Sequence, residues 1–198
     1  MFIIGITGGT GAGKTTALRV LESLGALALD CDAIYHELLA SSEDMKTELE
    51  ARFPGVLTDG AIDRRQLGAI VFSDPAALID LNAITHKYVT KAVENRIADW
   101  ESQGGRTAAI DAIALIESGI DVKCDIVVGV IAPYETRISR IMDRDGITRE
   151  QAVMRIEAQK ADSFFEEHCD HILENAFNAP EEFEANCKVF FAEIIAEK

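Results

Sequence analysis

Residues 8–15 read GGTGAGKT. They stand between the apolar run FIIGI at residues 2–6 and the segment TALRVLESL at residues 16–24, whose apolar residues recur with helical spacing. The eight residues satisfy the pattern G-x-x-x-x-G-K-[ST], with two glycines, a lysine and a threonine at the fixed positions. A strand, this pattern and then a helix together predict a loop that binds phosphate groups.

The residue types in this loop suit a nucleoside triphosphate. Glycines allow backbone N–H groups to converge on phosphates without Cβ clashes, and the helix N-terminus adds partial positive charge. Lys14 is placed to reach the β- and γ-phosphates, and the hydroxyl of Thr15 is placed to ligate Mg²⁺. The alternative is a glycine-rich turn with a surface lysine, which the flanking strand and helix make the weaker interpretation. The loop leaves the acceptor of the phosphoryl group open.

The order of apolar runs predicts an α/β protein. Five strands are expected, at residues 2–6, 26–29, 107–110, 126–131 and 171–173. Helical patterns separate them, which predicts a parallel sheet with helices on both faces. The stretch from 32 to about 100 is almost entirely helical in pattern, with a turn at Asp59-Gly60, and is interpreted as an insertion after the second strand.

We therefore expect one domain with the P-loop kinase fold over residues 1–198. Its core would comprise residues 1–31 and 105–198, and its helical insertion residues 32–104. Helix caps are predicted at Asp63 and at Ser73/Asp74, and a capping box at Thr148-x-x-Gln151.

Composition limits the classes of function. The net charge of -15 argues against a nucleic-acid surface, which needs a basic footprint. Four scattered cysteines without a CxxC pair are interpreted as reduced thiols rather than zinc ligands. No apolar run reaches the length of a membrane span, and no signal peptide is recognised, so a cytoplasmic protein is expected. The sequence gives no information about the oligomeric state.

Three uses of a bound triphosphate remain to be compared. A GTPase would carry Asn-Lys-x-Asp after a strand; the nearest segment is Gln159-Lys160-Ala161-Asp162, which begins with the wrong residue and is expected within a helix. A nucleotide-dependent switch has no obvious need of an insertion beside the phosphates. A small-molecule kinase does need such a lobe, to bind an acceptor and to exclude water.

Two carboxylates follow the second predicted strand. Asp30 and Asp32 stand where the carboxyl ends of parallel strands face a ligand crevice. One carboxylate could accept the proton of an attacking hydroxyl, and its neighbour could support the metal. The alternative is that Asp32 caps the helix that begins Ala33-Ile34-Tyr35.

Five arginines fall between residues 137 and 155 of this acidic chain, namely Arg137, Arg140, Arg144, Arg149 and Arg155. Helical spacing places the first three along one face. Guanidinium groups bind phosphate oxygens bidentately, so a phosphate-binding lid at about 137–160 is favoured. A solvent face with salt bridges to neighbouring carboxylates is the alternative.

Together these motifs resemble one family, the dephospho-coenzyme A kinases. The resemblance runs nearly end to end and covers GITGGTGAGKTT, LDCDAIYHEL, GAIDRRQLGAIVF, LNAITHK, DAIALIESG, RIMDRDGITREQAVMRIEAQ and DHILEN. It implies a five-stranded parallel core, a helical coenzyme-binding lobe and a mobile lid. It further implies ATP-dependent phosphorylation of the ribose 3′-hydroxyl of dephospho-coenzyme A, with Mg²⁺. Alternatives are a P-loop kinase for another nucleotide-like acceptor and a nucleotide-dependent switch.

The resemblance also implies roles for individual residues. Asp32 would be the general base, acting with Lys14 and Arg140 as the catalytic residues. The ATP-binding residues would be Gly11, Ala12, Gly13, Lys14, Thr15, Thr16, Arg140 and Asn175, the last of these near adenine. The residues toward the acceptor would be Asp32, His36, Arg64, His86 and Glu117, although His36 stands where the family often carries arginine. Thr15 would be the metal ligand.

Overall fold

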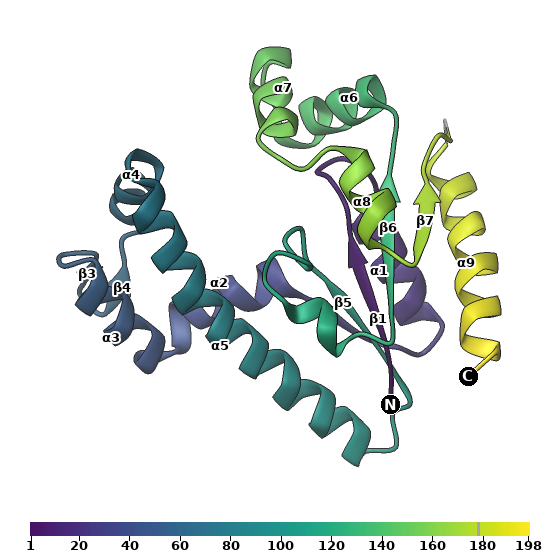
Figure 1. Ribbon diagram of the computed structural model, residues 1–198, viewed down its shortest axis with the longest axis horizontal. Helices are drawn as coiled ribbons and strands as arrows, with labels where there is room; N and C mark the ends of the chain where they lie inside the picture. The colour runs from purple at the N-terminus through teal and green to yellow at the C-terminus, as the bar shows by residue number, and fades with distance from the viewer. Residues whose placement is uncertain (178) are drawn as a thin grey trace. The chain divides into compact units, whose positions relative to one another are not determined.

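The computed structural model describes residues 1–177 and 179–198 (Figure 1). The chain divides into two compact units. One comprises Met1–Leu29 and Trp100–Lys198, and the other comprises Asp30–Asp99. No helix in the described part of the chain is both long and apolar enough to cross a bilayer.

The larger unit is built on the sheet that the sequence predicts. The strands are β1 (Phe2–Thr7), β2 (Leu27–Asp30), β5 (Thr107–Asp111), β6 (Ile126–Ile131) and β7 (His171–Glu174). They form one five-stranded parallel sheet in the order β2-β5-β1-β6-β7. All five predicted strands and the predicted fold class are confirmed. Because β1 lies between β5 and β6, the loop that follows it emerges at the centre of the sheet's carboxyl edge.

Helices cover both faces of this sheet. Helices α1 (Lys14–Ser23) and α9 (Pro180–Ala196) pack on one face, and α8 (Asp162–His168) packs on the other. Helices α6 (Tyr134–Asp145) and α7 (Arg149–Glu157) pack on each other through a separate buried cluster, and a 3₁₀ turn spans Ile120–Lys123. The predicted capping box is confirmed, since the Thr148 hydroxyl accepts from the Gln151 amide while the Gln151 side chain accepts from the Thr148 amide.

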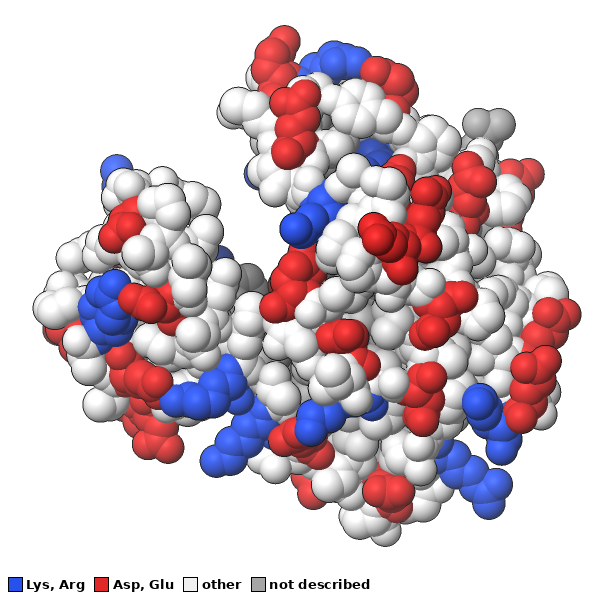
Figure 2. Space-filling model, viewed as in Figure 1, with Lys and Arg blue, Asp and Glu red and all other residues white. Residues whose placement is uncertain are grey.

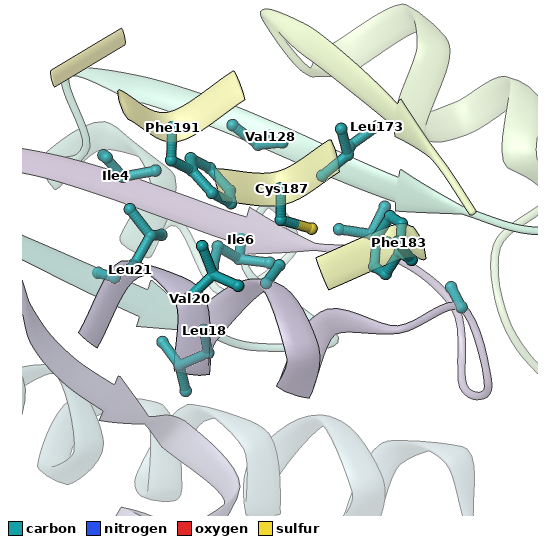
Figure 3. Close-up of a cluster of buried hydrophobic side chains, with 14 of the residues drawn as sticks. Ile4, Ile6, Leu18, Val20, Leu21, Val128, Leu173, Phe183, Cys187 and Phe191 are labelled. Carbon is teal, nitrogen blue, oxygen red and sulfur yellow. The ribbon is translucent and has the colours of Figure 1, made fainter. Parts of the chain in front are cut away.

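The alternation of side chains along the central strands explains why helices pack on both faces. Ile4 and Ile6 of β1 and Val128 of β6 point to one face and enter a buried cluster with α1 and α9 (Figure 3). The residue between two such positions, Gly129, points to the other face, where Phe165 of α8 packs closely on it. The sheet is therefore buried on both sides, as its continuous apolar runs predict.

The smaller unit is mainly helical. Its elements are α2 (Cys31–Ser41), α3 (Glu43–Arg52), β3 (Leu57–Thr58), β4 (Ala61–Ile62), α4 (Arg64–Ser73) and α5 (Pro75–Ser102), the last of which extends beyond Asp99. A separate buried cluster holds it together, with members such as Met45, Leu49 and Phe53 from α3 and its C-terminal end.

The β3-β4 hairpin interrupts a stretch that the sequence pattern describes as almost all helical. The predicted turn at its tip is confirmed, because Asp59 and Gly60 adopt φ values of 50° and 78°. The strands were missed because each has only two residues, too few to show the alternation that identifies a strand.

Local capping signals in this unit are confirmed. The Asp63 carboxylate accepts from the amides of Arg65 and Gln66 at the start of α4. The Asp74 carboxylate accepts from the Ala76 amide, and Pro75 is the first residue of α5.

One expectation about the larger unit is wrong. The segment from Gln159 to Asp162 was expected within a helix, but α7 ends at Glu157 and α8 begins only at Asp162. The side chain of Gln159 is bound to the glycine-rich loop, at Thr10, by hydrogen bonds. These tertiary contacts hold Gln159 in the connection, and local sequence pattern does not record them.

Phe191 of α9 tests the packing of this core. It is fully buried among residues of β1, α1 and α9, so Phe191→Ala leaves a cavity and is expected to lower the free energy of unfolding by about 3–5 kcal/mol. Urea denaturation measures the change. The control is Val189→Ala on the same helix, where the side chain is 60% exposed and the expected change is within about 0.5 kcal/mol. Equal effects of the two substitutions would contradict the assigned core.

Candidate active site

The glycine-rich loop spans residues 8–13, between the end of β1 at Thr7 and the start of α1 at Lys14. Gly13 stands at the N-cap position of α1, and no side chain in the described part of the chain caps this helix end. The Thr16 amide donates back to the Gly13 carbonyl at 3.0 Å. The dipole of α1 favours an anion at this end of the helix.

Lys14 lies across the loop. Its Nζ donates to the carbonyl oxygen of Gly8 at 3.0 Å and to that of Gly9 at 3.4 Å. Thr15, the next residue, is exposed on the first turn of α1. The structure therefore places a cation over the loop and an accessible hydroxyl oxygen at the adjoining helix end, as the motif predicts.

Gly13 has two reasons to be a glycine. Its φ of 119° lies in the region that side-chain-bearing residues rarely adopt. A methyl group there would also lie 2.5 Å from Nδ2 of Asn175 and 2.9 Å from the ring of Phe183. The sequence pattern explains the glycines of the loop by the approach of phosphates, and the structure adds a second reason, close packing against the protein.

Asn175 and Arg140 bind the loop directly. Asn175 is only 4% exposed; its Nδ2 donates to the Ala12 carbonyl at 2.8 Å and its Oδ1 accepts from Arg140 at 3.1 Å. Arg140 also donates to the Gly11 carbonyl at 3.3 Å, and burial lowers the pKa of its guanidinium group. Both residues hold the loop in this structure. Their contacts with phosphate and adenine remain predictions.

The five clustered arginines divide into two groups. Arg137, like Arg140, contacts the loop. The other three bind carboxylates: Arg144 and Arg155 both pair with Asp145, and Arg149 pairs with Glu135 at 2.6 Å. Hydrogen bonds, first from Arg144, lower the pKa of Asp145 to about 2. For these three arginines the structure shows the salt-bridged face that was the alternative interpretation, and Figure 2 shows acidic and basic side chains side by side over α6 and α7.

A cavity of about 380 Å³ opens beside the loop. It is lined by Gly9, Ile113, Glu117, Ala158, Gln159, Lys160 and Phe165. Glu117, which the family resemblance singled out, thus lies on a surface shared with the loop. Lys160 was missed, because only the fold of the α7–α8 connection brings this cation to the loop.

Asp111 is a further candidate site residue that was not identified from the sequence. It ends β5 in register with Ile6 of β1, one residue before the loop-bearing end of that strand, and it is 8% exposed. The available signal was the one used for Asp30 and Asp32, namely a carboxylate directly after a buried strand.

In the smaller unit, the structure corrects the interpretation of Asp32 as a helix cap. Helix α2 begins at Cys31, and Oδ1 of Asp30 accepts from the Ala33 amide at 2.9 Å, so Asp30 is the cap. The sequence pattern placed the helix start two residues late. Asp32 lies in the first turn with an exposed carboxylate that, among the described residues, has no hydrogen-bond or ion-pair partner.

Other predicted acceptor residues lie on α2, α4 and α5. His36 follows Asp32 by four residues on α2, so the two share one helix face. The centre of the His36 ring lies 5.3 Å from that of the Tyr35 ring. Burial raises the pKa of the Tyr35 hydroxyl, and the positive charge of Arg64 opposes this shift. Arg64 is exposed at the start of α4, and His86 is half-buried on α5. A common site of His36, Arg64 and His86 remains a prediction.

Comparison with known proteins decides the family. Residues 2–181 match the family profile described as Dephospho-CoA kinase. The chain belongs to the dephospho-CoA kinase family.

Relatives and solved structures agree with this assignment. The dephospho-CoA kinase of Geobacter sulfurreducens is 40% identical over 161 residues, which cover 80% of this chain and 82% of the relative. The solved structure of TT1252 from Thermus thermophilus is 32% identical, covers 97% of each chain and has a TM-score of 0.80. The dephospho-CoA kinase from Campylobacter jejuni, at 24% identity, covers 97% of this chain and 96% of its own, and its TM-score of 0.70 supports the fold.

Gly13→Ala tests the packing of the loop in this member of the dephospho-CoA kinases. The clash with Asn175 and Phe183 must displace the loop, so we expect loss of measurable ATP binding by calorimetry. The control is Gly25→Ala, which has a comparable φ of 90° but no atom within 4 Å. It should lower stability by about 1–2 kcal/mol and leave ATP binding intact. Equal loss of ATP binding in both variants would indicate a general loss of folding and would contradict a local effect of the contact at Gly13.

Proposed function

We propose that this protein transfers the γ-phosphoryl group of ATP to the ribose 3′-hydroxyl of dephospho-coenzyme A, giving coenzyme A and ADP. This is the reaction of the family to which the chain belongs, and it is the last step of coenzyme A synthesis. The observation that carries the proposal is a glycine-rich loop at the start of α1 that is spanned by Lys14, in a chain that matches the family over residues 2–181.

Phosphoryl transfer requires positioning and charge stabilisation more than covalent chemistry. The loop amides and the start of α1 would bind the triphosphate, through residues 11–16. Lys14 would leave the Gly8 and Gly9 carbonyls to pair with the β- and γ-phosphates. Arg140 would offset charge on the transferring group, and Asn175 would lie near adenine.

Mg²⁺ fits the donors present. A hydroxyl oxygen such as that of Thr15 suits a hard cation, and Mg²⁺ in such sites takes few protein ligands and several phosphate and water oxygens. The described residues accordingly offer no cluster of three or more His, Cys, Asp or Glu side chains for a dedicated metal cage. When bound, the ion would supply positive charge that offsets the negative charge developing on the phosphates.

The acceptor would be bound by the insertion, proposed as residues 32–104. Asp32 is the proposed general base, supported by its exposed and unpartnered carboxylate in the described part of the chain. His36, Arg64, His86 and Glu117 are the proposed contacts of dephospho-coenzyme A. The segment at about 137–160 is the proposed lid, and the cytoplasm the proposed location.

An acceptor assay tests the proposal. The protein is mixed with MgATP and dephospho-coenzyme A, and ADP and coenzyme A are measured together. Equal amounts of both products support the kinase. ADP formation that ignores the acceptor supports a nucleotide-dependent switch, and faster turnover with another nucleotide-like acceptor supports a different kinase. Omission of Mg²⁺ should abolish transfer.

Asp32→Asn tests the proposed base. The amide cannot accept the proton of the ribose hydroxyl, so we expect turnover to fall by at least about 10²-fold while ATP binding persists. The control is Asp80→Asn in the same unit, which removes only a surface pair with Arg52 and should leave turnover unchanged. Near-normal turnover of Asp32→Asn would exclude the assigned role.

A further inference from the structure

Arg137 of α6 is a buried cation without a role in the proposed reaction. It is 4% exposed, and its guanidinium group makes contacts in three directions. Its Nε donates to the Thr10 carbonyl at 2.9 Å, one terminal nitrogen to Asp162 Oδ1 at 3.3 Å, and the other to Gln159 Oε1 at 3.3 Å. Burial lowers the pKa of the guanidinium group and the charge of Asp162 opposes that shift.

Gln159 binds the remaining polar groups of the same loop residue. The Thr10 amide donates to Gln159 Oε1 at 2.8 Å, and Gln159 Nε2 donates to the Thr10 hydroxyl at 2.7 Å. The amide, carbonyl and hydroxyl of Thr10 are therefore all bound by two side chains from outside the loop. Such a residue has little freedom to change its orientation.

The location of Thr10 makes this constraint relevant to phosphate binding. Thr10 lies between Gly9 and Gly11 in the loop. A loop that binds phosphates must direct its carbonyl oxygens away from them, and Arg137 holds the Thr10 carbonyl toward α6. The buried charge of Arg137 also adds positive potential beside a site for an anion, where screening by water is weak.

Gly9 provides the space for this arrangement. A methyl group on Gly9 would lie 2.1 Å from a terminal nitrogen of Arg137. The φ of Gly9 does not lie in the glycine-favouring region, and the three nearest atoms to such a methyl group all belong to the Arg137 guanidinium. The guanidinium group cannot move aside without losing its bonds to Thr10, Gln159 and Asp162.

We propose that Arg137 and Gln159 are positioning residues for phosphoryl transfer, which hold Thr10 so that the glycine-rich loop keeps its phosphate-binding conformation. Gly9 leaves the space that the Arg137 guanidinium group occupies. The inference rests on the proposed function, because it assumes that this loop binds a triphosphate. It couples the loop to α6 and to the α7–α8 connection.

The test combines kinetics, calorimetry and thermal unfolding on Arg137→Ala, Arg137→Lys and Gln159→Ala. Displacement of a loop by about 1 Å can lower a rate 10²-fold, so kcat/KM for MgATP should fall by about that factor in Arg137→Ala. ATP affinity should fall in parallel, whereas KM for the acceptor should stay constant. Arg137→Lys keeps the positive charge but loses the planar guanidinium group. Its kcat/KM and its ATP affinity should therefore lie between those of the wild type and Arg137→Ala.

A matched control separates positioning from stability. Lys46, in the Asp30–Asp99 unit, is also a buried cation, at 5% exposure. Lys46→Ala, which truncates this buried side chain, should lower the midpoint of thermal unfolding as Arg137→Ala does, but leave ATP affinity unchanged. The inference would be overturned if Arg137→Ala, Arg137→Lys and Gln159→Ala all lost stability but kept wild-type ATP affinity in the folded fraction.

A double-mutant cycle tests the contact itself. Gly9→Ala should weaken ATP binding in the wild-type background and have little further effect in Arg137→Ala, where the space is vacant. Equal effects in both backgrounds would overturn the inference. If the wild-type protein binds ATP but transfers nothing to dephospho-coenzyme A, the proposed function fails while the cycle still measures the positioning of the loop.

Discussion

Close packing of the loop between β1 and α1 constrains the rest of the larger unit. Its glycines admit groups of α6, β6 and the segment after β7 to near contact. The loop can hold this position because β1 is the central strand of the sheet and is buried on both faces. A rigid strand and a packed helix therefore fix both ends of a segment that has almost no side chains of its own.

Electrostatics follows from the same arrangement. The chain carries a net charge of -15, yet Lys14, Arg137 and Arg140 all donate hydrogen bonds to loop carbonyls. Partial removal from water strengthens the electrostatic interactions of these charges relative to those of charges on the surface. The arginines farther along the proposed lid segment instead pair with Asp145 and Glu135. Membership of one sequence cluster thus does not imply one function, because burial and partner decide what each cation can do.

Much of the local structure could be predicted because its signals are short-range. The phosphate-loop pattern, the strand runs, the Asp63 cap and the Thr148 capping box each depend on residues within a few positions of one another. The β3-β4 hairpin could not be predicted from such signals because its strands are too short. The first residue of α2 could not be predicted because Asp30 and Asp32 are both suitable caps, and only backbone geometry selects Asp30.

The sequence alone determined the α/β class, the phosphate loop and the family, since these depend on residue order and spacing. Only the tertiary structure decided that Asn175 supports the loop, that Gln159 leaves the helix to bind Thr10, and that Gly9 accommodates Arg137. The residues in these pairs are separated by more than a hundred positions. Such contacts form through packing of the sheet and its helices, and nothing in the local chemistry of either segment specifies its partner.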